Sequence, residues 1–141
     1  IGICGSGEAY VDEAAISVLI GRFDEELFRI FPSTDLGLEP ASRVIGPWLE
    51  DHDAMLTLIH GDSSSDMDPI SVMMGLDRLI GGFLVGGMTS SRGDNVQFAD
   101  DCVTGGMSGI AFSSELDTVT ALTHGCAPLG GMHKLHDASI M

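Results

Sequence analysis

The middle of the chain has the pattern of a strand, a helix and a second strand, and this pattern limits the possible folds most. Residues 54–59 are an unbroken apolar run, and the pair Asp68-Pro69 suits a helix start, since aspartate caps helices and proline fits their first turn. Apolar residues then recur near helical spacing as far as Gly81, and residues 83–85 are a second apolar run. Two strands joined in this way are expected to be parallel, with a right-handed crossover.

The part of the chain before this unit predicts one more strand and one more helix. Residues 14–20 are an apolar run rich in Ile and Val, which predicts a buried strand. Residues 42–50 predict a helix with Ser42 as its cap, and the pair Gly46-Pro47 is expected to weaken or restart it.

After the unit, the pattern changes to short strands separated by turns. Residues 96–103, 107–112 and 118–123 each predict a strand, with Thr104 to Gly106 turning the chain between the first two. This arrangement is an antiparallel meander. The predicted fold class is therefore α/β, with a mixed sheet in which a βαβ unit is followed by an antiparallel meander.

Charge and cysteine content limit the partners and the compartment. The chain has 21 acidic and 6 basic residues, a formal net charge of −15, so it offers no basic surface for nucleic acid or for an anionic membrane. No stretch approaches the ~18 apolar residues of a membrane helix. Its three cysteines, Cys4, Cys102 and Cys126, are far apart and form no disulfide framework, which favours a reducing, cytoplasmic location.

Glycine-rich segments after the predicted strands indicate a ligand pocket. Glycine lets the backbone turn and lets another group come close, and ligands bind at the carboxyl ends of strands in α/β sheets. Three such segments are expected to converge, and neither glycine-rich phosphate-binding motif is present in them. The candidate ligand-binding residues are His60 and Ser63 after the first strand, Gly86, Gly87, Met88, Thr89 and Ser90 after the second, and Gly125, Cys126 and Pro128 near the end. Arg92 is the nearest cation for a ligand carboxylate.

Two other chemistries remain open at this stage. Cys4 lies in a glycine-rich segment that resembles a nucleophile elbow, with His60 or His124 as base and Asp62 to orient it, although Ser6 stands where the elbow needs glycine. The alternative to this cysteine-dependent hydrolase is a glycine turn with a buried cysteine. His60 or His124 could instead be the axial ligand of a haem. The histidine and cysteine spacings match no zinc site, so no metal ligand is assigned.

Four segments, in this order, resemble the FIST domain, named for F-box and intracellular signal transduction proteins. They are Gly2 to Glu8, Ile16 to Ile20, Gly86 to Ser90, and His124 to Gly130. The match covers nearly the whole chain and corresponds to the N-terminal half of the family's domain. Residues 1–141 are therefore expected to be one sensory domain, incomplete at both ends.

The resemblance also implies a function. It implies a non-catalytic sensory domain that binds a small molecule, such as an amino acid or a related metabolite, and signals to a histidine kinase, a cyclic-dinucleotide enzyme or an F-box partner. Some relatives bind haem and sense nitric oxide, so haem is the one cofactor to consider. Expected partners include no nucleic acid and no membrane.

Overall fold

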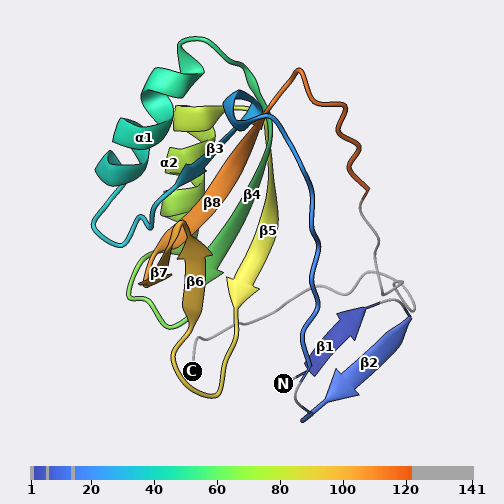
Figure 1. Ribbon diagram of the computed structural model, residues 1–141. Coiled ribbons are helices and arrows are strands. Elements are labelled where there is room, and N and C mark those ends of the chain that lie inside the picture. The colour runs from blue at the N-terminus through green and yellow to red at the C-terminus, as the bar shows by residue number, and fades with distance from the viewer. Residues whose placement is uncertain (1, 6, 14, 122–141) are drawn as a thin grey trace, which may run out of the picture.

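A four-stranded mixed sheet with two helices on one face forms the main body of the protein (Figure 1). The computed structural model describes residues 2–5, 7–13 and 15–121. In spatial order the strands are β3, β8, β4 and β5. The elements of this body are β3 (Phe28–Phe31), α1 (Glu39–Leu49), β4 (Ala54–Asp62), α2 (Pro69–Ile80), β5 (Phe83–Thr89) and β8 (Met107–Ser113).

The βαβ unit predicted from the sequence is confirmed. Strands β4 and β5 pair in parallel, and α2 connects them. The Asp68 side chain caps α2 by accepting a hydrogen bond from the N–H of Ile70 at 3.2 Å. Gly81, with φ of 70°, ends the helix in a conformation that glycine adopts without strain.

The fold class is also confirmed, because antiparallel strands complete the sheet. β8 lies between β3 and β4 and is antiparallel to both. The sequence did not predict β3, because its four residues, Phe28–Phe31, are too few to show a clear alternation. Two two-stranded sheets stand beside the main one: β1 (Gly2–Gly5) with β2 (Glu8–Val11), and β6 (Val96–Ala99) with β7 (Asp101–Thr104).

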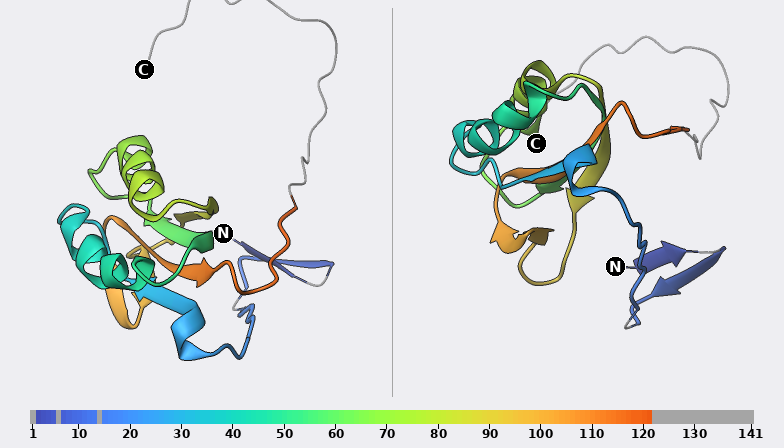
Figure 2. Two further views of the ribbon diagram at one scale, coloured as in Figure 1. Left: turned by 90° about the horizontal axis from the view of Figure 1, so that it is seen from above. Right: turned by 45° about the horizontal axis from the view of Figure 1, so that its top comes forward.

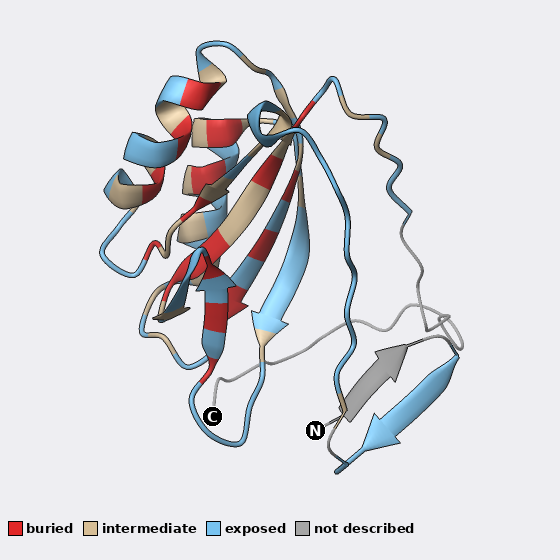
Figure 3. Ribbon diagram, in the orientation of Figure 1, coloured by how far each residue is buried: buried red, intermediate tan, exposed pale blue. Residues whose placement is uncertain are grey.

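The hydrophobic core fills the space between the sheet and the two helices (Figure 3). α1 contributes a stripe of buried residues at helical spacing, Ala41, Ile45 and Trp48. The indole Nε1 of Trp48 also donates a hydrogen bond to the carbonyl of Glu26 at 2.7 Å, which fixes the chain just before β3. The other buried core residues are Phe31, Ile59, Leu76, Ile80, Met107 and Ala111.

Neither described α-helix lies over the opposite side of the sheet, which we call the open face (Figures 1 and 2). Alternate residues of a strand point to opposite faces, so the neighbours of the core residues point to this side. The hairpin of β6 and β7 covers one end of it. The apolar residues of the open face are Phe28, Ile30, Leu56, Leu58, Phe83, Val85, Ile110 and Phe112.

The predicted buried strand at residues 14–20 is wrong over the described residues 15–20. This segment has no regular structure, and Ile16 and Leu19 are 88% and 100% exposed. A strand needs a neighbour to satisfy its backbone groups, and no strand of the described residues pairs with this segment. Strand β2, Glu8–Val11, was also not predicted from the sequence.

The other boundaries differ in detail. Residues 96–103 are two strands rather than one, because Asp100, with φ of 64°, turns the chain between β6 and β7. Residues 118–121 form no strand, and the rest of that predicted strand, to 123, lies outside the described residues.

Helix α1 starts earlier than predicted and does not restart. It begins at Glu39, ahead of the predicted cap Ser42, and it continues through Pro47 to Leu49. The buried stripe on the sheet holds the helix together across the proline. Neither described helix has the length and apolar character needed to cross a membrane.

Candidate functional site

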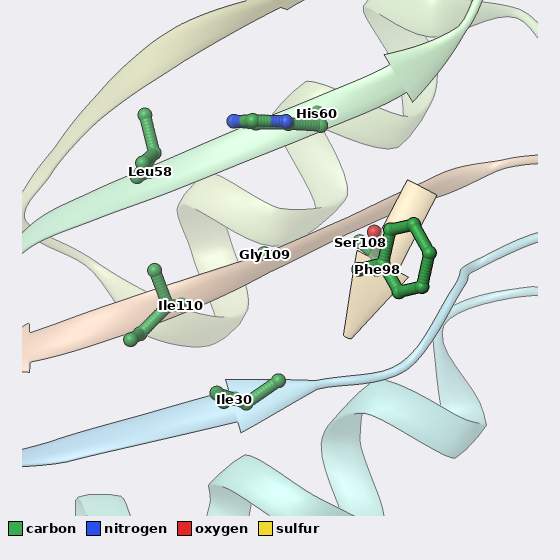
Figure 4. Close-up of a pocket in the computed structure, with 7 residues that line it drawn as sticks. All are labelled: Ile30, Leu58, His60, Phe98, Ser108, Gly109 and Ile110. Atoms are coloured by element: carbon green, nitrogen blue, oxygen red, sulfur yellow. The ribbon is translucent and has the colours of Figure 1, made fainter. Parts of the chain in front are cut away.

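A shallow cavity of about 250 Å³ lies on the sheet surface at the boundary between the open face and the β6–β7 hairpin (Figure 4). We call it the His60 hollow. Its walls are mainly apolar and come from four strands, β3, β4, β6 and β8. The lining residues are Ile30, Leu58, His60, Phe98, Ser108, Gly109 and Ile110.

Strand alternation explains why these residues meet. Along β4, Thr57 and Ile59 are buried under the helices, so Leu58 and His60 point to the other side. In the pairing of β4 with β8, Leu58 lies opposite Ile110 and His60 opposite Ser108. The lining side chains of β4 and β8 therefore stand in two adjacent rows across the middle of the sheet.

Ser108, which lines the hollow, forms a buried polar pair with Gln97. The side-chain oxygen of Gln97 accepts hydrogen bonds from the N–H and the Oγ of Ser108, at 3.1 and 2.7 Å. The Gln97 Nε2 donates to the carbonyls of Gly105 and Gly106 at 3.2 and 3.3 Å. These bonds fasten the β6–β7 hairpin to β8. They also use the hydroxyl hydrogen of Ser108, so it is not free for a ligand.

His60 is the titratable side chain in the lining of the hollow. Among the described residues, no side chain or backbone group forms a hydrogen bond or an ion pair with its imidazole. The His60 residue is exposed, and its ring lies beside Leu58 on the same strand in the close-up (Figure 4). An imidazole can donate or accept a hydrogen bond, so His60 can meet a polar group of a ligand whose apolar part contacts the neighbouring side chains.

The carboxyl ends of β4 and β5 hold a second polar cluster, centred on Asp62. Its Oδ1 accepts hydrogen bonds from the N–H and Oγ of Ser64, at 2.7 and 2.6 Å, and from the Nδ2 of Asn95 at 3.1 Å. Its Oδ2 accepts from the N–H of Gly105 at 2.9 Å. These donors, the Ser64 hydroxyl first, lower the pKa of Asp62 to about 2. The carboxylate therefore ties two loops together and does not contact His60 as the predicted orienting group would.

The glycine-rich segment predicted as a turn is part of a strand. Gly86, Gly87 and Met88 lie within β5, and Thr89 is its last residue, because the parallel pairing with β4 continues as far as Asp62 opposite Thr89. Gly86 has φ of 152°, and a Cβ added there would lie 1.8 Å from the carbonyl oxygen of Ile59. Glycine is thus needed here for the close approach of two strands.

The predicted hydroxyl groups form contacts within the protein. Thr89 Oγ1 donates to the carbonyl of Gly61 at 2.9 Å, and Ser63 Oγ donates to the carbonyl of Thr89 at 2.9 Å. Together they link the ends of β4 and β5. Of the described candidate residues, His60 alone lines the hollow, while Ser63 and residues 86–90 do not.

Three further candidates can be placed only in part. Arg92, the expected partner of a ligand carboxylate, forms an ion pair with Asp12. Cys4 lies in β1, which is followed by β2 and not by the helix that a nucleophile elbow requires. His124, Gly125, Cys126 and Pro128 lie outside the described residues.

Sequence reasoning missed most of the lining. Leu58 was predicted only as part of a strand, and Ile30, Phe98, Ser108 and Ile110 were not singled out. Burial along residues 107–113 does not alternate regularly, because the neighbours Met107 and Ser108 are both buried, so the sequence carried no local signal for Ser108 or Ile110. The residues that the structure describes contain no cluster of three or more His, Cys, Asp or Glu side chains that could hold a metal ion.

Comparison with known proteins gives one match. The family model described as the FIST N domain matches residues 1–138. No curated protein and no solved structure matches the chain.

Proposed function

The chain belongs to the FIST family of sensory domains in signal transduction, and from this premise we propose that it senses a small molecule bound in the His60 hollow. One observation supports this site above the others. The hollow combines a mainly apolar lining with an imidazole that has no partner among the described residues. Ligand sites typically have this composition, with few polar groups that fix the orientation of the ligand.

The size and charge of the site favour an amino acid or a related metabolite. A volume of about 250 Å³ lies below the ~300 Å³ at which pockets for drug-sized ligands begin. The net charge of −15 repels anions, so a zwitterion is a better ligand than a dicarboxylate. In our proposal the apolar part of the ligand contacts Leu58, Ile30 and Ile110, and a carboxylate or amide group meets His60.

The other predicted contacts have a secondary place in this proposal. Ser63 and Thr89 hold the ends of β4 and β5 together, so they support the strand that carries His60. Gly125, Cys126 and Pro128 remain predicted ligand contacts from the last segment of the chain.

Haem fits the chemistry of the hollow but not its size. An imidazole among apolar side chains suits haem iron, yet a macrocycle needs more room than about 250 Å³. We therefore propose a non-catalytic, cytoplasmic sensor without a cofactor. Ligand binding would shift the balance between two conformations, and a signalling partner such as a histidine kinase, a cyclic-dinucleotide enzyme or an F-box protein would respond to that shift.

The proposal is tested by filling the hollow. Leu58 lines it, whereas Val85, its register partner on the open face, does not. Native mass spectrometry of the purified protein would first show any retained molecule, and calorimetry against the twenty amino acids would then measure affinity. We expect Leu58→Trp to weaken binding at least about tenfold, or ~1.4 kcal/mol, and Val85→Trp to change it far less.

Comparing the two variants distinguishes blocking of the hollow from a general loss of structure. Both positions are partly exposed, at 37% for Leu58 and 40% for Val85, so both variants should fold. Equal losses in the two variants would place the binding site elsewhere. Retained haem, or no response of the wild-type protein to any amino acid, would contradict the proposed ligand class.

A further inference from the structure

The open face is an apolar surface that neither described α-helix covers. Phe83 is 55% exposed, Val85 40% and Leu58 37%, although all three belong to the central sheet. A sheet with an apolar face normally buries it against a second layer. Patches of this kind on soluble proteins mark a surface that contacts something.

Two other segments expose apolar residues without regular structure. In residues 15–20, Ile16, Leu19 and Ile20 are 88%, 100% and 86% exposed. In residues 117–121, Val119 is 95% exposed. Both segments are rich in the β-branched residues that favour strands, and in the first of them Ile16, Val18 and Ile20 alternate with Ser17 and Leu19.

The topology starts these two segments from neighbouring strands. The first leads into β3 and the second leaves β8, and these strands are antiparallel neighbours, with Phe28 opposite Phe112. Both segments therefore start from the same end of the sheet, and both run on the side away from the helices (Figures 1 and 2). Because the strands are antiparallel, the segments that extend them have the relative direction of an antiparallel pair.

One side chain just after the first segment already packs on the open face. The ring of Phe23 packs edge-on against the rings of Phe28 and Phe112, with centroid separations of 6.5 and 5.7 Å. Ile20 is only three residues away along the chain. A surface on the same chain, held this close, meets the segment at a far higher effective concentration than a separate molecule does.

We propose that residues 15–20 and 117–121 pair as an antiparallel ribbon that packs its apolar side on the open face. Pairing is required because backbone N–H and C=O groups of a single strand laid on an apolar surface would have no partners. Six extended residues span ~20 Å, about the length of β8. Ile16, Val18 and Ile20 form the inward side of this ribbon, and Ser17 and Leu19 point away.

Docking of the ribbon would enclose the His60 hollow, because the hollow opens on the same face of the sheet. This consequence rests on the proposed function, while the docking itself does not. A molecule in the hollow would then contact both the sheet and the ribbon that covers it. Its binding would therefore favour the conformation in which the ribbon is docked.

Hydrogen exchange of the full-length protein tests the ribbon without any ligand. The amides of residues 15–20 and 117–121 are expected to exchange at least about tenfold more slowly than unstructured peptide amides. Exchange at the unprotected rate in both segments, with and without ligand, would overturn the proposal. A protein that shows protected segments but binds no amino acid would instead contradict the proposed function alone.

A matched pair of substitutions gives a second measurement. Val18→Asp would place a charge on the inward side of the ribbon, so we expect it to lower the unfolding midpoint by about 5 °C or more. Ser17→Asp, on the outward side, is expected to leave the midpoint nearly unchanged. Val18 is 68% exposed as the segment stands, so equal, small effects in both variants would mean that the ribbon does not dock.

The alternative occupant of the open face is a second copy of the chain. Sedimentation across a range of concentrations, combined with hydrogen exchange, distinguishes the two. An intramolecular ribbon protects the amides of both segments from exchange even when the protein is monomeric. Protection that appears only together with dimers and disappears on dilution would overturn the proposal in favour of self-association.

Discussion

At the residue scale, Asp62 connects the strand that carries His60 to two loops. Its carboxylate accepts hydrogen bonds from Ser64, Asn95 and Gly105, which are remote from one another in the chain. None of these partners is charged, so the stabilisation of the carboxylate comes from directed N–H and O–H groups. Sequence reasoning could nominate Asp62 as polar and near a strand end. The identity of its partners depended on the β6–β7 hairpin, which was not predicted.

The lowered pKa of Asp62, about 2 against an ordinary 3.8, predicts a specific loss of stability in acid. A carboxyl group with a lower pKa in the folded state contributes its full stabilisation above pH ~4, and loses it as pH falls toward ~2, because the unfolded chain takes up the proton first. Asp62→Asn should lower the unfolding midpoint at pH 7 and flatten its decline between pH 4 and 2. Thermal unfolding by circular dichroism at each pH measures both effects.

The control for this prediction is Asp77→Asn on the surface of α2, where the side chain has no hydrogen bond or ion pair among the described residues. This variant should follow the wild-type pH profile. An Asp62→Asn profile with the same slope as wild type would show that Asp62 does not carry the acid sensitivity.

At the element scale, the βαβ unit was predictable because its signals are local. Asp68 and Gly81 act within one turn of α2, and both play the roles that their sequence context indicates. The extent of β5 was not predictable, because Gly86 and Gly87 read as a turn in isolation. Only the position of the Ile59 carbonyl explains why a strand continues through two glycines.

Because of that contact, a side chain is tolerated at Gly87 but not at Gly86, which gives a prediction for the pairing of β4 and β5. Gly86→Ala forces a Cβ to within 1.8 Å of the Ile59 oxygen at φ of 152°, so the strands must move apart. We expect a loss of about 3 kcal/mol in the free energy of unfolding, measured in urea. Gly87→Ala is the control, since an added Cβ there has nothing within 4 Å and should change stability by less than about 1 kcal/mol.

Similar losses in both variants would mean that strand propensity, and not the close approach, explains Gly86. An unchanged Gly86→Ala protein would mean that β5 can separate from β4 at this point without cost.

At the scale of the whole molecule, the fold class followed from the order of local patterns, whereas the candidate site did not. Residues 15–20 illustrate the limit: an Ile- and Val-rich run predicts a strand, but only pairing with another strand produces one. The His60 hollow needs β8 between β3 and β4, an arrangement set by contacts between distant parts of the chain. His60 was identified because it follows an apolar run, while Ile110 and Phe98 had no local signal.

The net charge of −15 gives the last prediction, which concerns the dependence of stability on salt. With 21 acidic against 6 basic residues, repulsion dominates the long-range electrostatics of the folded chain. The two ion pairs given by the described residues, Arg43 with Glu39 and Arg92 with Asp12, are exposed and contribute little. Raising NaCl from 10 to 150 mM shortens the screening length from ~30 to ~8 Å. The unfolding midpoint should therefore rise by a few degrees in scanning calorimetry, with a neutral osmolyte at equal osmolality as the control. A midpoint that falls with salt would show that attraction between opposite charges, including those of residues 122–141, outweighs the repulsion.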